Sequence, residues 1–454
     1  MISSDLANFA EAKLRLGLEG IFINKDKKME NLYENNLIAE GKTKRIYQTE
    51  IPEYVVIESK DDLTAGDGAK HDIIKGKAVF SNTTTSNVFR LLKKCDIPVA
   101  FIEKISETKF ISEKCTMIPY EVVIRREAHG SFLKRRPELK RGHLFPRLII
   151  EFFLKTSNKK WQDVDLLKDD PLIIFQDNSA HLYLPDQPIY QQNPFAMLES
   201  FPLKESPKVF EEINEIATQV FLVLEKQWQL IDKKLVDLKM EFGINAVGTL
   251  KLADVIDNDS WRLLENGKYI DKQIYRDGAN LETVSLMYQL VTTLTGNFKL
   301  PQQQIILWRA SKSDDINLFQ ETIDLYKAQE ICEVKIITCS IHKEPMRGLQ
   351  EIIKLVQEIP DSVILTFVGR SNGLGPTLSA QVTVPVITIP ANYKDFPEDI
   401  WSSLRTPSDT PVMTVLDPKN ATIAALQILA MRNPRLYAKL RSKQENHFYN
   451  IVKV

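Results

Sequence analysis

Cysteine is scarce in this sequence: only Cys95, Cys115, Cys332 and Cys339 occur among 454 residues. Their spacing fits neither a zinc site nor a small domain stabilised by disulfides. We therefore expect reduced thiols in a cytoplasmic protein. The N-terminus, Met1-Ile-Ser-Ser-Asp5, agrees with this expectation because it lacks the basic start and apolar core of a secretory signal.

Excess charge and long apolar runs are also missing. The 59 Lys and Arg residues almost balance the 60 Asp and Glu residues, which argues against nucleic-acid binding through bulk charge. No apolar run approaches the length of a membrane span. We therefore expect neither a nucleic-acid nor a membrane partner. The length instead predicts a globular protein of about two or three domains.

The residues that are present change in character near position 300. Before it, strands and helices follow irregularly from a first hairpin over residues 37–60, as in an α+β domain. The segment 300–304 (Leu-Pro-Gln-Gln-Gln) is polar and led by proline, which indicates a linker. Beyond it, strands expected at 305–307, 334–338 and 362–368 alternate with helices expected at 315–330 and 348–359. This alternation predicts a parallel sheet with right-handed crossovers.

The segment 235–254 carries the most informative pattern. Apolar residues at positions 236, 238, 240 and 242 alternate with the polar residues Asp237, Lys239 and Glu241, which predicts a half-buried strand. A turn over 243–248 and a returning strand over 250–253 would bring Asp254 near Glu241. Paired carboxylates suit a magnesium–nucleotide site, although a surface hairpin with ordinary charges fits the spacing as well. Strict alternation puts Asp254 on the apolar face, so it reaches such a site only through a bulge or a strand end.

Two shorter features precede this segment. Lys42 and Lys44 lie two residues apart on the first hairpin, where ammonium groups can neutralise phosphate charge, although solvated lysines are commoner there. Residues 64–68 (Thr-Ala-Gly-Asp-Gly) form a small loop whose backbone N–H groups can approach a phosphate closely, although most such loops are only turns.

Taken together, these features resemble one family. The segments 41–44 (Gly-Lys-Thr-Lys), 64–68, 117–119 (Met-Ile-Pro), Arg125 with 130–135 (Gly-Ser-Phe-Leu-Lys-Arg), 235–243 and 253–262 occur in the order found in SAICAR synthetase, phosphoribosylaminoimidazole-succinocarboxamide synthase. The resemblance covers residues 35–298 and is to the animal type. It implies an α+β, ATP-grasp or kinase-like fold and an ATP-dependent ligase. That ligase joins L-aspartate to the carboxylate of carboxyaminoimidazole ribonucleotide (CAIR) through an acyl phosphate.

The same resemblance implies a set of site residues. ATP would be bound by Lys42, Lys44, Gly66, Asp67, Gly68 and Glu241, and Mg2+ by Glu241 and Asp254. The nucleotide substrate would be bound by Arg125, Ser131, Arg262, Lys272 and Arg276, with Lys42 and Arg125 acting in catalysis. The segment 156–200 departs from the family pattern, so a different amine or carboxylate substrate is an open alternative.

Three loops of the second half follow expected strands. They are 311–314 (Ser-Lys-Ser-Asp), 340–345 (Ser-Ile-His-Lys-Glu-Pro) and 369–376 (Gly-Arg-Ser-Asn-Gly-Leu-Gly-Pro). Helix capping would also explain the Ser and Asp residues, and a lone loop histidine is commonly incidental. The glycine spacing is not that of a dinucleotide fingerprint. Because the carboxyl ends of parallel strands meet at one edge of a sheet, we expect the loops to converge on a ligand there.

With Trp401-Ser-Ser-Leu-Arg405, these loops resemble animal-type phosphoribosylaminoimidazole (AIR) carboxylase over residues 304–454. The resemblance implies a three-layer α/β, Rossmann-like fold, a homo-octamer built on this domain, and addition of CO2 to aminoimidazole ribonucleotide (AIR) without a cofactor. The product, CAIR, is the substrate of the first domain. His342 would transfer a proton. Substrate would be bound by Ser311, Ser313, Asp314, Lys343, Gly369, Arg370, Ser371, Asn372 and Gly373.

The two resemblances predict an N-terminal extension (1–34), a synthetase-like domain (35–298), a linker (299–304) and a carboxylase-like domain (305–454). Ala310, Ile341 and Asp409 depart from the carboxylase pattern, and each is expected to add bulk or stiffness near the pocket. Beside a bifunctional enzyme, an inactive carboxylase-like scaffold that multimerises an active synthetase is therefore an open alternative.

Overall fold

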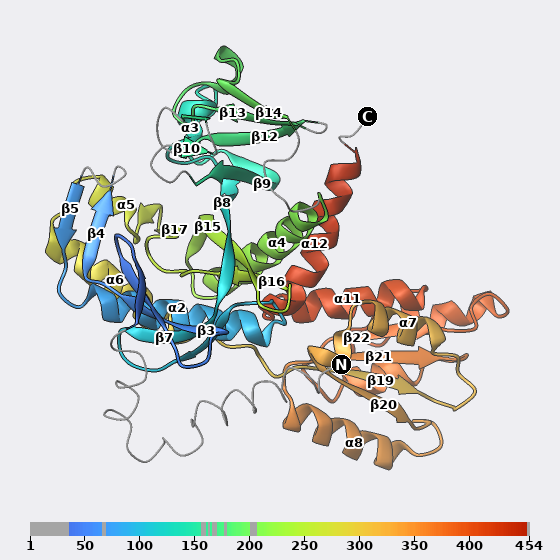
Figure 1. Ribbon diagram of the computed structural model, residues 1–454. Coiled ribbons are helices and arrows are strands. Elements are labelled where there is room, and N and C mark those ends of the chain that lie inside the picture. Colours follow the sequence, from blue (N-terminus) through green and yellow to red (C-terminus); the bar gives the residue numbers. More distant parts are fainter. Residues whose placement is uncertain are drawn as a thin grey trace. The chain divides into compact units, whose positions relative to one another are not determined.

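The computed structural model describes residues 36–65, 70–155, 160–161, 164–165, 170–176, 179–199 and 207–451 (Figure 1). They form two compact units. The first holds the described residues up to Phe221 together with Ile231–Phe298, and the second holds Leu222–Leu230 and the residues from Lys299 onward. The predicted N-terminal extension lies outside the described residues. No helix among the described residues is long and apolar enough to cross a membrane.

The first unit begins with a five-stranded antiparallel sheet of order β1-β2-β3-β7-β6. Its strands are β1 (Leu37–Glu40), β2 (Lys44–Gln48), β3 (Tyr54–Ser59), β7 (Lys109–Glu113) and β6 (Phe101–Lys104). The hairpin predicted over residues 37–60 is confirmed, with three strands instead of two. Helix α2 (Lys77–Lys94) covers this sheet, and α6 (Leu281–Thr295) packs on α2. A separate ribbon pairs β4 (Asp62–Ala65) with β5 (Lys70–Ile73).

A nine-stranded sheet forms the rest of this unit, in the order β14-β13-β12-β9-β8-β15-β17-β18, with β16 paired to β15. Its strands are β14 (Ala196–Glu199), β13 (Ser179–Tyr183), β12 (Leu172–Gln176), β9 (Leu144–Leu154), β8 (Cys115–Glu127), β15 (Lys234–Asn245), β16 (Leu250–Ala253), β17 (Trp261–Glu265) and β18 (Lys268–Tyr269). The remaining elements are α3 (Phe132–Arg135), β10 (Lys160–Trp161), β11 (Val164–Asp165), the 3-10 turn η3 (Ile189–Gln191) and α5 (Gln273–Arg276). Helix α4 (Pro207–Gln229) is divided between the two units, since its residues from Leu222 onward belong to the second.

The predicted strand is confirmed as β15, but it is not half-buried, because Asp237 and Glu241 on its polar face are buried as well. The predicted turn over 243–248 begins too early. The strand continues to Asn245, and the turn spans 245–249, where the Asn245 side chain accepts the N–H groups of Val247 and Thr249. Gly243 is needed for close approach and not for a turn. A Cβ at this position would lie 2.7 Å from Cys115 Cβ on the neighbouring strand β8.

The second unit confirms the predicted parallel sheet. Its order is β20-β19-β21-β22-β23, and every pair is parallel. The strands are β20 (Glu333–Thr338), β19 (Gln304–Arg309), β21 (Ser362–Val368), β22 (Val386–Pro390) and β23 (Met413–Thr414). The helices are α7 (Asn317–Leu325), α8 (Pro345–Glu358), α9 (Leu374–Ser379), α10 (Trp401–Leu404), α11 (Pro418–Ala430) and α12 (Pro434–Ile451), with short 3-10 turns η4 (Ala328–Glu330) and η5 (Pro397–Ile400).

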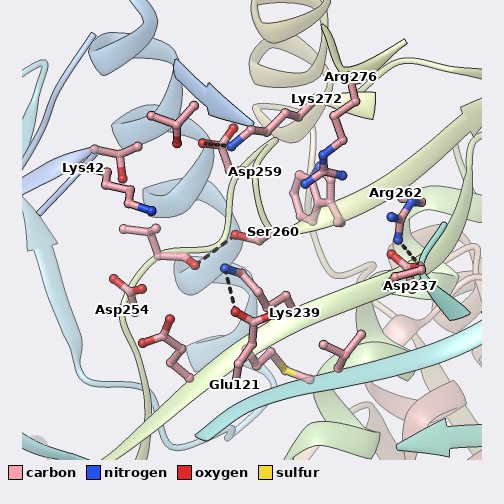
Figure 2. A pocket seen from close by; sticks show the side chains of 18 of the residues that line it. Lys42, Glu121, Asp237, Lys239, Asp254, Asp259, Ser260, Arg262, Lys272 and Arg276 are labelled. Atoms are coloured by element: carbon pink, nitrogen blue, oxygen red, sulfur yellow. Dashed lines mark hydrogen bonds and ion pairs between the residues drawn. The ribbon is translucent and has the colours of Figure 1, made fainter. Parts of the chain in front are cut away.

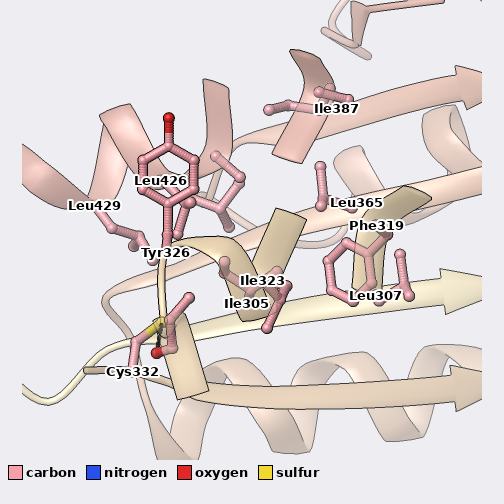
Figure 3. Packing of buried hydrophobic residues seen from close by; sticks show 14 of the residues in the cluster. Ile305, Leu307, Phe319, Ile323, Tyr326, Cys332, Leu365, Ile387, Leu426 and Leu429 are labelled. Atoms are coloured by element: carbon pink, nitrogen blue, oxygen red, sulfur yellow. Dashed lines mark hydrogen bonds between the residues drawn. The ribbon is translucent and has the colours of Figure 1, made fainter. Parts of the chain in front are cut away.

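Helices cover both faces of this sheet, as a three-layer α/β fold requires (Figure 1). Alternate residues of β19 serve the two cores: Ile305 and Leu307 pack with α7 and α11 (Figure 3), and Ile306 and Trp308 pack with α8 and α9. Two helix boundaries differ from the expected ones by more than two residues. Helix α7 ends at Leu325 and gives way to a 3-10 turn, and α8 begins at Pro345, because proline is well suited to the first helical position.

Candidate active site

A cavity of about 380 Å³ opens in the first unit between β2, β8, β15, β17 and α5 (Figure 2). Nine of the predicted site residues line it: Lys42, Lys44, Arg125, Ser131, Glu241, Asp254, Arg262, Lys272 and Arg276. Gly66, Asp67 and Gly68 lie outside the described residues. The tertiary structure therefore brings together residues that are up to 234 positions apart in the sequence, from Lys42 to Arg276.

The predicted carboxylate pair lies at one end of the cavity. Ala253 is paired with Glu241 across β16 and β15, and Asp254 follows at the strand end with a left-handed backbone, φ 63°. This strand end is what lets Asp254 leave the apolar face. Each carboxylate is paired with a lysine: Asp254 with Lys44, and Glu241 with Lys155 at 2.7 Å.

The charges at this end shift one another's pKa. Burial works to raise the pKa of Glu241, but Lys155, Lys44 and Lys239 together hold it below its ordinary value. Burial lowers the pKa of Lys44 to about 8, against the attraction of Glu241. The carboxylate therefore stays ionised near neutral pH, which is the state that binds a divalent cation.

A chain of alternating arginines and carboxylates forms the other end. Asp237 Oδ2 accepts hydrogen bonds from Arg262 (2.6 Å) and Arg125 (2.7 Å), and Arg125 also binds Glu151 (2.7 Å). Glu151 in turn accepts two N–H groups of Arg135. These three arginines face only two carboxylates, which leaves one positive charge unbalanced. Of the three, Arg262 is the one whose guanidinium lies nearest the open cavity. Such an end suits an anionic ligand.

Arg125 itself is nearly enclosed, with 3% of its surface exposed. Burial works to lower its pKa, but Glu151 and Asp237 raise it above the ordinary value. Arg125 reaches the cavity wall, yet its guanidinium already serves two carboxylates. Its observed contacts therefore hold Asp237 and, through it, Arg262.

A third cluster surrounds Asp259 between the two ends. Lys272 Nζ lies 3.0 Å and Lys77 Nζ 3.5 Å from Asp259 Oδ2, and the Tyr288 hydroxyl also binds this carboxylate. Burial works to raise the pKa of Asp259, but the two lysines hold it well below its usual range. Lys272 thus lines the cavity as predicted, but its ammonium group forms an ion pair with Asp259. The neighbouring Arg276 is exposed, and its guanidinium donates to the Gln273 side chain at 3.2 Å.

Several cavity residues were missed from the sequence. Lys239 and Glu121 form an ion pair at 3.2 Å, and they line the cavity with Asp237, Asp259 and Ser260 (Figure 2). The polar positions of β15 gave a usable signal, because Asp237, Lys239 and Glu241 share one strand face. Asp259 and Ser260 fall within the segment 253–262 that the family resemblance had already marked, whereas no comparable signal marked Glu121 on β8.

In the second unit, the predicted convergence of the three loops is confirmed. The segments 311–314, 340–345 and 369–373 follow β19, β20 and β21 at the carboxyl edge of the sheet. The His342 ring lies so close to Gly373 that a Cβ there would collide with His342 Nε2, and a Cβ on Gly369 would lie 3.7 Å from Asp314 Oδ1.

The remaining predicted residues at this edge of the sheet differ in how exposed they are to solvent. Ser311 and Ser313 share a hydrogen bond of 2.8 Å and are exposed, as are Lys343, Arg370 and Ser371. Arg370 binds Asp399 at 2.7 Å. Asn372 is buried, and its side chain bonds Gly375 N (2.9 Å) and Ser403 Oγ (3.2 Å), so in this structure it supports the loop.

The expectation that Ile341 adds bulk beside the pocket is wrong. Its side chain is 6% exposed and belongs to the core under α8, next to Trp308 and Cys339. Gly348 makes this possible, because a Cβ there would lie 2.6 Å from Ile341 Cδ1. Asp409 adopts φ 61°, a left-handed conformation that aspartate tolerates better than most residues. All four cysteines are free, as expected.

Known protein families and individual proteins match this chain over most of its length. A SAICAR synthetase family model matches residues 37–293, and an AIR carboxylase family model matches 304–448. The probable multifunctional protein ADE2 of Caenorhabditis elegans is 36% identical over 91% of this chain and 95% of its own length. The multifunctional protein ADE2 of Gallus gallus is 38% identical, over 91% and 94%. A solved phosphoribosylaminoimidazole-succinocarboxamide synthase from Ehrlichia chaffeensis is 29% identical with a TM-score of 0.47, covering 58% of this chain and 100% of that protein.

Proposed function

The chain belongs to the family of bifunctional AIR carboxylase and SAICAR synthetase proteins, and from this premise we infer that it catalyses two consecutive reactions of purine biosynthesis. The second unit is the carboxylase, a lyase that forms CAIR, and the first unit is the synthetase, a ligase that consumes it. The observation that carries the synthetase assignment is one cavity with two lysine-paired carboxylates at one end and an unbalanced arginine charge at the other.

We propose that the carboxylate end binds ATP and Mg2+. Glu241 and Asp254 would hold the cation, since Mg2+ prefers oxygen ligands and is commonly bound by one or two carboxylates together with phosphate oxygens. When bound, Mg2+ neutralises phosphate charge. Lys42 and Lys44 face the same space and would neutralise the phosphate that leaves ATP. Entry of the cation requires Lys44 and Lys155 to release the two carboxylates, which their ammonium groups can do by moving to phosphate oxygens.

At the arginine end, Arg262, Ser131 and Arg276 would bind the phosphate of CAIR, with Arg125 and Asp237 fixing Arg262. The CAIR carboxylate would then lie between the two ends, where ATP converts it to an acyl phosphate. The amine of L-aspartate displaces that phosphate. This chemistry needs positioning and charge neutralisation more than a covalent nucleophile.

For the carboxylase step, we propose that His342 moves the proton of AIR while the substrate lies on the loop 369–373. The ring carbon of AIR is enamine-like, so CO2 addition needs no cofactor. Ser311, Ser313, Asp314 and Lys343 would bind the ribose phosphate, and Arg370 and Ser371 the reacting end. We further propose a cytoplasmic homo-octamer built on the second unit, with no nucleic-acid or membrane partner.

The test is CO2-dependent conversion of AIR without ATP, comparing wild type with His342→Ala. We expect wild-type activity and a loss of roughly 100-fold or more in the variant, because a positioned general acid–base group contributes that much. Folded wild-type protein without this activity would favour the scaffold alternative. The core position of Ile341 argues against that alternative, since the residue does not fill the site.

Substrate profiling of the synthetase with amines other than L-aspartate tests the second alternative, which is motivated by the divergent segment 156–200. Turnover of CAIR with L-aspartate, and with no other amine tested, supports the main assignment. Faster turnover with another amine would show that this amine, and not L-aspartate, is the preferred substrate.

A further inference from the structure

Glu127, His129 and Tyr269 form a hydrogen-bonded cluster that the proposed chemistry leaves unused. His129 is only 2% exposed, and both ring nitrogens have partners. The Tyr269 hydroxyl lies 2.7 Å from Nδ1, and Glu127 Oε2 lies 3.2 Å from Nε2. Glu127 Oε1 also accepts a 2.7 Å bond from Lys234. The cluster therefore connects the end of β8 and the start of β15 to β18.

The Glu127 carboxylate can accept but not donate, so its hydrogen bond with the ring places a proton on His129 Nε2. Burial raises the pKa of Tyr269, so the hydroxyl keeps its proton and can donate to His129 Nδ1. Burial works to raise the pKa of Glu127, but His129 and Lys234 hold it below its ordinary value, so it accepts from Nε2–H. A histidine ring with its proton on Nε2 satisfies both partners.

The residues that follow His129 reach the substrate cavity. Gly130 has φ 57°, and a Cβ there would collide with the Arg262 guanidinium, so Arg262 rests directly on this turn. Ser131 comes next and lines the cavity beside Arg262. On the outer side, the Arg141 guanidinium covers the Tyr269 ring at 4.7 Å from its centroid. The turn that presents Ser131 and supports Arg262 is therefore anchored from behind by His129.

We propose that His129 and Tyr269 are positioning residues for the nucleotide substrate. They hold the turn at Gly130 so that Ser131 and Arg262 together meet the phosphate of CAIR. Neither occurs among the described residues that line the cavity, so they act through Ser131 and Arg262 and not by contact with the ligand. This inference rests on the proposed function of the cavity.

The first test is Tyr269→Phe, which removes one hydroxyl and keeps the ring under Arg141. We expect the KM for CAIR to rise roughly 3- to 10-fold, the range for losing one hydrogen bond, with kcat and the KM for ATP within about twofold of wild type. The matched control is Tyr47→Phe in β2, which removes a hydroxyl that binds Glu58, also at 2.7 Å. Its KM for CAIR should stay at the wild-type value.

A second pair of variants separates positioning from a general loss of stability. His129→Asn keeps a polar group near the Nδ1 position, whereas His129→Leu loses both partners. We expect the KM for CAIR to increase from wild type to His129→Asn to His129→Leu, at temperatures well below the Tm of each protein. An unchanged KM in folded Tyr269→Phe, or an equal rise in Tyr47→Phe, would overturn the inference while wild-type activity upheld the cavity's function. Wild-type protein without synthetase activity would overturn both.

Discussion

At the scale of single residues, the cavity of the first unit is a set of exchangeable ion pairs. Lys44 binds Asp254, Lys272 binds Asp259, and Arg262 binds Asp237. Buried charges are costly unless paired, so these pairs keep the cavity stable before a ligand enters. An anionic substrate can then take the place of a carboxylate without leaving a cation unpaired.

Asp271 gives a residue-scale prediction about pH. It is fully buried and accepts the N–H groups of Leu263 and Gln273 at 2.7 Å each, which ties β17 to the start of α5. Burial raises its pKa to about 7. Because the folded state then holds a proton that the unfolded state has lost, Asp271 should make stability fall as pH rises from about 4 to about 7.

The measurement is thermal unfolding of wild type and Asp271→Asn between pH 5 and pH 8. Wild type should lose stability relative to the variant across this range, by an amount on the order of 2 kcal/mol. Asp277→Asn, an exposed site in the same segment, is the control and should follow wild type. Parallel profiles for wild type and Asp271→Asn would contradict the assignment.

At the scale of elements, helix α8 packs closely against the segment that follows β20 because α8 has a glycine, Gly348, at the point of contact. Gly348 leaves the space that Ile341 fills, and Trp308 Nε1 donates to Cys339 O at 2.9 Å beside them. His342 follows Ile341 directly. The packing of α8 on the sheet therefore determines where the candidate proton-transfer residue stands.

Gly348→Ala tests this fit. Alanine alone would favour the helix by about 1 kcal/mol, but its Cβ would overlap Ile341, so we expect a net loss of about 1–3 kcal/mol in stability. Carboxylase kcat/KM should fall several-fold while synthetase activity stays constant. In an Ile341→Ala background, the same change should be neutral or stabilising. Additive effects in this double-mutant cycle, followed by thermal unfolding and by both assays, would rule the coupling out.

At the scale of the whole molecule, the chain places two candidate active sites in separate units. The candidate synthetase residues lie in the first unit and the candidate carboxylase loops in the second. The two reactions are consecutive, yet among the residues that the structure describes neither candidate set includes a residue of the other unit. The activities should therefore be separable by single substitutions.

Glu241→Gln and His342→Ala test this separation. Glu241→Gln removes one candidate Mg2+ ligand, so synthetase turnover should fall roughly 100-fold or more, with carboxylase activity retained. His342→Ala should show the reverse pattern. An equimolar mixture of the variants should convert AIR to SAICAR when ATP, CO2 and L-aspartate are supplied. Loss of both activities in either variant, with the Tm unchanged, would show that the sites depend on each other.

The sequence by itself determined the local features of this protein. Period-two alternation predicted β15, and strand–helix alternation predicted the parallel sheet, because side-chain direction repeats with the backbone. Ordered motifs indicated the family and most of the candidate residues. These signals are local, so they carry over from sequence to structure without knowledge of the fold.

Only the tertiary structure decided which groups meet. Arg125 and Asp237 are 112 residues apart, and their contact depends on the register of β8 against β15. Asp254 faces the cavity through a left-handed strand end, and Ile341 turns into the core because Gly348 leaves room for it. Ion pairing and packing depend on distances through space, which no periodicity along the chain specifies.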